Sequence, residues 1–120
     1  MSKNEYRKTL ELTLEQIAEA RAVWEEGTLK SANNELYAIL ERCFAVFTEM
    51  KEDTAKRRAL NALLTDRSMK PRANTSLGLK VIRFVFGKEG NREQAYARVL
   101  GIAYDLKPDD QSFTAYIEQC

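Results

Sequence analysis

The residues of this chain with the clearest chemical potential are cations concentrated between positions 54 and 92. This segment holds ten of the nineteen lysines and arginines and only two acids, so its charge is about +8. Lysine and arginine neutralise phosphates and release the counterions around nucleic acids, which supplies most non-specific affinity. The sequence therefore predicts a cationic surface that binds nucleic acid or an acidic partner, formed by Lys56, Arg57, Arg58, Arg67, Lys70, Arg72, Lys80, Arg83, Lys88 and Arg92.

The basic segment lies between two acidic ones. Residues 1–53 carry a charge of about −4 and residues 93–120 about −3, so the chain of 120 residues has a formal net charge of only +1. Such segregation is informative about partners and not about the fold. The alternative interpretation is that the cations form solvated helix faces or pair with the acidic flanks after folding.

The residue types argue against catalysis. The chain contains no histidine, which excludes Ser-His-Asp and Cys-His nucleophile pairs, histidine-ligated metals and imidazole acid/base chemistry. Glu11, Glu15 and Glu19 recur every four positions, but di-metal sites in helical bundles rely on Glu-x-x-His pairs. A solvated acidic face is the simpler explanation. We expect no catalytic residue, no metal and no cofactor, and hence a protein that is not an enzyme.

The connector GKEGN, residues 87–91, has features of two motifs, the phosphate-binding P-loop and the DNA-binding helix-turn-helix. It follows a predicted helix instead of a strand and lacks GK[ST], which excludes a P-loop. In a helix-turn-helix, Asn91, Arg92 and Gln94 would begin the helix that reads base edges. The connector is longer than the usual three- to four-residue turn of that motif, so we do not favour it.

Cysteine content and hydropathy bear on the cellular compartment. Cys43 and Cys120 match no disulfide framework or metal spacing, and we expect a small core residue and an exposed thiol, respectively. No apolar run approaches the ~20 residues of a membrane helix. The N-terminus lacks the apolar region of a signal peptide. We expect a cytoplasmic protein that makes no membrane contact.

The elements that must position the cations are helices. Apolar residues recur with a helical period throughout, and no stretch alternates with period two. At 44% hydrophobic residues, the chain has enough apolar side chains for one core. We predict an all-α fold, a compact bundle of five to six helices that forms a single domain over residues 1–120.

The N-terminal half is predicted to contain three helices. The first begins at Asn4 or only after Thr13, which forms a capping-box pattern with Gln16, and it ends at residue 27. The second starts near residues 31–33 and is expected to be the most buried element. A third is capped by Asp53 or Thr54, although residues 51–54 contain no glycine or proline and the two could form one long bent helix.

The C-terminal half is predicted to begin with a polar linker, residues 66–74. Asn74 or Thr75 opens a fourth helix, and Asn91 with Gln94 opens a fifth that runs through Leu106 and buries it in the core. A short last helix covers residues 111–119.

Single residues add further expectations. Gly101 inside the fifth helix costs up to ~1 kcal/mol relative to alanine, which suggests close packing on a neighbouring element. Phe84 lies at the border of the polar stripe and is either a core residue or a base-stacking one. Trp24, Tyr104 and Tyr116 are candidate interface anchors if they are exposed.

Two functions fit these features. The first is a non-enzymatic binding protein whose cationic central surface contacts nucleic acid. The alternative is a small protein-binding inhibitor or adaptor, for example an anti-defence or regulatory protein of a phage or plasmid, that docks on a larger protein or nucleoprotein. A homodimer is possible because the second helix is apolar nearly all round.

Overall fold

In the computed structural model, which describes residues 2–26, 33–88 and 90–119, the chain forms helices and no strand. The predicted all-α fold is thus confirmed. The helices are α1 (Lys3–Glu26), α2 (Asn33–Lys51), α3 (Thr54–Asp66), α4 (Leu77–Phe86), α5 (Asn91–Leu106) and α6 (Phe113–Glu118).

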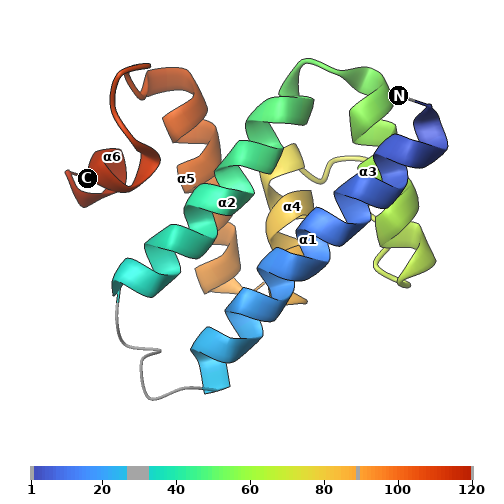
Figure 1. The fold of residues 1–120 in the computed structure, drawn as a ribbon, viewed down its shortest axis with the longest axis horizontal. Coiled ribbons are helices and arrows are strands. Elements are labelled where there is room, and N and C mark those ends of the chain that lie inside the picture. Colours follow the sequence, from blue (N-terminus) through green and yellow to red (C-terminus); the bar gives the residue numbers. More distant parts are fainter. Residues whose placement is uncertain (1, 27–32, 89, 120) are drawn as a thin grey trace.

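The helices surround one hydrophobic core. Helices α1 and α2 run side by side in opposite directions across the front of the view, with α4 and α5 behind them (Figure 1). Helix α3 packs against the N-terminal half of α1, and α6 lies beyond α5 near the C-terminus. Helix α4 contacts α1, α2, α3 and α5, so it occupies the centre of the bundle.

Helix α4 is therefore the most enclosed helix, and the expectation that the second helix would be is wrong. Its buried side chains cover most of its surface: Val81, Ile82, Phe84, Val85 and Phe86. By contrast, Ala38, Glu41 and Arg42 on α2 are exposed to solvent. The predicted helical period of α2 is confirmed, since Leu40, Cys43 and Met50 are buried, whereas Ala38 and Arg42 face solvent.

The boundaries of the first three helices decide between the predicted alternatives: the early start of the first helix and the cap at Asp53 are confirmed. Helix α1 begins at Lys3, so Thr13 lies inside it and caps nothing, because Leu10 and Leu14 continue one buried seam. Helices α2 and α3 are separate. Asp53 has extended backbone angles (φ −125°, ψ 104°), and its carboxylate accepts a hydrogen bond from the Lys56 amide. The expected helix end at residue 27 and start near residues 31–32 lie outside the described residues, as does Cys120.

The helices of the C-terminal half also begin one or two residues from where the sequence suggests. Ser76 caps α4 by accepting from the Leu79 amide, because Thr75 instead closes a turn in which its hydroxyl accepts from the Arg72 amide. Gly90 precedes α5, so Asn91 is already helical. Leu106 is 68% exposed, contrary to the predicted seam, because it lies on the outer face of α5 with Ile102, while Ala103 of the same turn is buried.

Two helical glycines have opposite environments. A Cβ added at Gly78 in α4 would lie 2.9 Å from the carbonyl oxygen of Ala97 in α5, closer than side chains tolerate. Gly78 thus allows the two helices to approach. A Cβ at Gly101 would meet no atom within 4 Å. The expectation of close packing at Gly101 is wrong, since that residue faces open space.

A pair of leucines on α1 tests the core. Leu14 is fully buried and Leu12 is 59% exposed. We expect Leu14→Ala to lower the free energy of unfolding by about 2–5 kcal/mol, through lost burial and a residual cavity. Leu12→Ala should change it by less than about 0.5 kcal/mol. Urea unfolding followed by circular dichroism measures both, and equal effects would contradict the described orientation of α1.

The two glycines provide a second matched pair. Gly78→Ala should destabilise the protein by about 1–3 kcal/mol, because its Cβ is forced against a backbone oxygen. Gly101→Ala should stabilise it by up to about 1 kcal/mol, because alanine is the better helix former and nothing obstructs it. Thermal unfolding of the two variants compares them. The same sign for both would be inconsistent with this packing of α4 on α5.

Candidate functional site

Among the ten predicted cations, Lys56, Arg67 and Arg92 form ion pairs with described acidic side chains. Arg67, just after α3, places Nη2 2.9 Å from Glu11 Oε2 and 3.6 Å from Glu15 Oε2, both on α1. Its guanidinium also lies 4.6 Å from the centroid of the Phe84 ring, which is only 6% exposed. Phe84 is therefore a core residue covered by Arg67, and Glu11 and Glu15 are paired instead of forming a purely solvated face.

Arg92 is held in the same way at the start of α5. Its Nη2 lies 3.3 Å from Glu25 Oε1 on α1, and its Nε lies 3.2 Å from Oε2 of the buried Glu93. The guanidinium also faces the rings of Trp24 and Tyr96. These contacts fix the first turn of α5 against α1, and Trp24, at 7% exposure, is not an exposed interface anchor.

Lys56 and Arg57, at the start of α3, have different partners. Lys56 Nζ lies 3.3 Å from Glu49 Oε1 and 5.2 Å from the Tyr6 ring centroid. Arg57 donates to the carbonyl oxygens of Met50 and Lys51 at the end of α2 and to Thr54 Oγ1. Carbonyl oxygens satisfy the guanidinium donors but carry no formal charge, so the cation of Arg57 is not neutralised.

Lys80 lies close to Arg57. The half-buried position of Lys80 in α4 and the neighbouring guanidinium together lower the pKa of its ammonium group. Like charges that approach in a partly desolvated place favour an anionic ligand between or beside them. Arg83, also on α4, is half-buried and has interactions within the fold.

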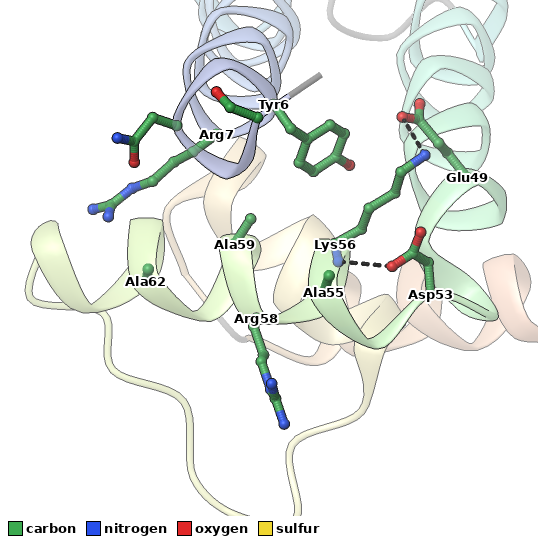
Figure 2. Close-up of a pocket in the computed structure, with 11 residues that line it drawn as sticks. Tyr6, Arg7, Glu49, Asp53, Ala55, Lys56, Arg58, Ala59 and Ala62 are labelled. Atoms are coloured by element: carbon green, nitrogen blue, oxygen red, sulfur yellow. Dashed lines mark hydrogen bonds and ion pairs between the residues drawn. The ribbon is translucent and has the colours of Figure 1, made fainter.

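The remaining four cations are exposed and pair with no other described residue: Arg58, Lys70, Arg72 and Lys88. Arg58 points away from α1, toward the side on which the chain leaves α3 for α4 (Figure 2). Lys70 and Arg72 belong to that connection, the linker of residues 67–76. We refer to Arg58, Lys70 and Arg72 as the linker cations. Lys88 lies beyond the opposite end of α4, about 15 Å away along a helix of ten residues.

The predicted cationic surface is therefore divided between the two ends of α4. Arg57, Lys80 and Arg72 lie toward its N-terminal end, whereas Lys88 and Arg92 lie beyond its C-terminal end. The sequence did not show this division, because the basic segment is continuous in the chain. In the folded protein, the length of α4 separates the two groups.

A groove of about 580 Å³ separates the start of α1 from α3. Its floor consists of Ala55, Ala59 and Ala62, and Tyr6 and Lys56 stand over it (Figure 2). The Tyr6 hydroxyl oxygen is buried and lies near the carboxylate of Glu49. Burial, together with the negative charges of Glu49 and Asp53, raises the pKa of Tyr6 to about 12.

A second groove, of about 390 Å³, lies where α2, α4 and α5 meet. Its lining includes two cations outside the predicted set, Lys51 and Arg98. Each is isolated within an acidic flank, so charge clustering along the chain could not identify them. The one available signal was Gly101, a helix-destabilising residue whose missing side chain leaves part of this groove open.

Other chemistries find little support in the described residues. Among them, no group of three histidine, cysteine, aspartate or glutamate side chains is arranged to hold a metal. Burial raises the pKa of the Cys43 thiol to about 12, so it is not a nucleophile at neutral pH. None of the described helices combines the length and apolar character needed to cross a membrane.

Comparisons of this chain with protein-family models, with curated proteins and with solved structures find no match.

Tyr6 gives a pH-dependent prediction. In the unfolded chain a tyrosine ionises near pH 10, and in the folded protein Tyr6 ionises at about 12. The folded state therefore loses stability relative to the unfolded state as the pH rises through this interval. Tyr6→Phe removes this contribution, so its urea midpoint should fall less than that of the wild type between pH 8 and pH 11. Parallel pH dependences would contradict the burial of the hydroxyl group.

Proposed function

We propose that this chain is a non-enzymatic protein that binds nucleic acid through the end of the bundle formed by α3, the linker and the start of α4. The observation that carries the proposal is the group of linker cations, which are exposed and have no carboxylate partner in residues 2–26, 33–88 and 90–119. Arg57 and Lys80 add charge that no acid within the described part of the chain neutralises.

The ion pairs elsewhere in the molecule support the choice of the linker cations as the binding residues. Arg67 and Arg92 serve to attach α1 to the rest of the bundle, so their charge is balanced inside the fold. The linker cations carry out no such structural task. Exposed arginine and lysine side chains without partners lose little on binding a phosphate, because no existing ion pair has to break.

The alternative, a protein-binding inhibitor or adaptor of the kind found in phages and plasmids, is favoured by a different observation. Ile102 and Leu106 are 49% and 68% exposed and lie four residues apart on α5, so they share one face. Exposed apolar side chains on one face suit a protein partner or a second copy of this chain. A cytoplasmic location is part of both proposals.

The test is fluorescence anisotropy with a labelled single strand of about 20 nucleotides and a duplex of the same length, across about 50–200 mM salt. We expect micromolar affinity at the lowest salt and a steep loss as salt rises. Arg58→Ala with Arg72→Ala should weaken binding about tenfold and reduce the salt slope on the single strand by about 1.4, or about 0.7 for each lost contact.

The matched control is Lys8→Ala with Arg42→Ala, which removes the same charge from two exposed positions on α1 and α2. It should leave the salt slope close to that of the wild type. Absence of binding at low salt would refute the proposed function. Equal losses in both double variants would show that net charge, and not this surface, determines the affinity.

A further inference from the structure

We propose that the groove between α2, α4 and α5 binds one nucleotide unit of a single-stranded nucleic acid, with the base in the groove and an adjoining phosphate between Lys51 and Arg98. This inference rests on the proposed function and specifies it, because it predicts a preference for single strands over duplexes. A base can enter such a groove only when it is unpaired.

The floor of the groove is apolar and suits the face of a base. It is formed by Phe47 from α2, Leu77 and Leu79 from the first turn of α4, and Ala97 from α5. The volume of about 390 Å³ lies within the usual range for small-ligand sites. Ser76 and Gln94 are the uncharged polar residues that line it, and side chains of these types can hydrogen-bond the edge of a base.

The two cations at the groove are not neutralised by acids. Lys51 Nζ lies 5.8 Å from the Phe47 ring centroid and 5.9 Å from that of Tyr104, and it forms no ion pair with a described carboxylate. The neighbouring Glu52 instead accepts a hydrogen bond of 3.1 Å from the Tyr104 hydroxyl group. Arg98 is exposed and likewise pairs with no other described residue. This charge suits a phosphate.

Gly101 is the residue that no structural role explains. It interrupts α5 at a position where alanine would fit without any contact, so packing does not require a glycine there. Its position on the wall of the groove means that any side chain would narrow the space available to a ligand. The absence of a side chain at this position therefore keeps this part of the groove open.

The groove is also continuous with the linker cations. Arg72 and Thr75 form one turn, and Ser76 both ends the linker and lines the groove. A strand whose phosphates contact Arg72 and Lys70 would therefore reach the groove within a few nucleotides. The linker would bind the backbone irrespective of sequence, and the groove would select unpaired bases.

Gly101→Leu tests the groove directly, because the added side chain occupies it. With a labelled single strand of about 20 thymidines, we expect the affinity to fall at least fivefold. Ala38→Leu, which adds the same side chain to an exposed position on α2, should bind as the wild type does. Adenosine monophosphate in excess should weaken strand binding by the wild type to about the level of Gly101→Leu and should not weaken binding by Gly101→Leu further.

A second variant keeps the proposal testable if Gly101→Leu fails to fold. Lys51→Ala with Arg98→Ala should weaken single-strand binding about tenfold, whereas the charge-matched Lys8→Ala with Arg42→Ala should not. If Arg58→Ala with Arg72→Ala weakens binding but neither groove variant does, the groove proposal is wrong and the proposed function stands. Duplex affinity equal to that of the single strand would also overturn the groove proposal. If neither oligonucleotide binds at low salt, both proposals fall.

Discussion

The burial of α4 is the constraint on which the rest of this structure depends. Ten residues with five large apolar side chains inside the bundle cannot be covered by one neighbour, so four helices surround them. The close approach of α4 to α5 requires a residue without a side chain at Gly78. Once α4 is placed centrally, its two ends separate the basic segment into two groups, and its first turn becomes one wall of the groove.

The ion pairs illustrate how a charged surface can be partly structural. Arg67 connects the end of α3 to α1, and Arg92 connects the start of α5 to the other end of α1. Both lie against aromatic rings, where the apolar part of the guanidinium also contributes packing. Acidic residues of the N-terminal flank therefore neutralise part of the basic segment within the fold. What remains for a partner is the fraction that folding leaves unpaired.

In the proposed function, the unpaired cations and the groove would contribute two different properties to binding. Exposed linker side chains provide electrostatic attraction that is independent of sequence and sensitive to salt. A partly enclosed apolar groove provides contacts that depend on the shape and exposure of a base. The helices α2, α4 and α5 form the walls of the groove, and the linker lies outside the helices and carries exposed charges.

The sequence by itself determined the helices, most of the core and the segregation of charge. These are local properties. Leu14, Cys43 and Val81 each lie on the periodic apolar face of their own helix, and the excess of cations in residues 54–92 can be counted along the chain. Helix starts at Ser76 and Gly90 were missed by one or two residues, because neighbouring polar residues competed for the same role.

Only the tertiary structure decided which cations remain available. Arg67 pairs with a residue 56 positions away, and Arg92 with one 67 positions away, so no local pattern could reveal either partner. For the same reason Lys51 and Arg98 appeared unremarkable in the chain and meet only where α2 and α5 converge. Secondary structure follows from short-range periodicity, whereas a binding surface depends on which distant side chains folding brings together.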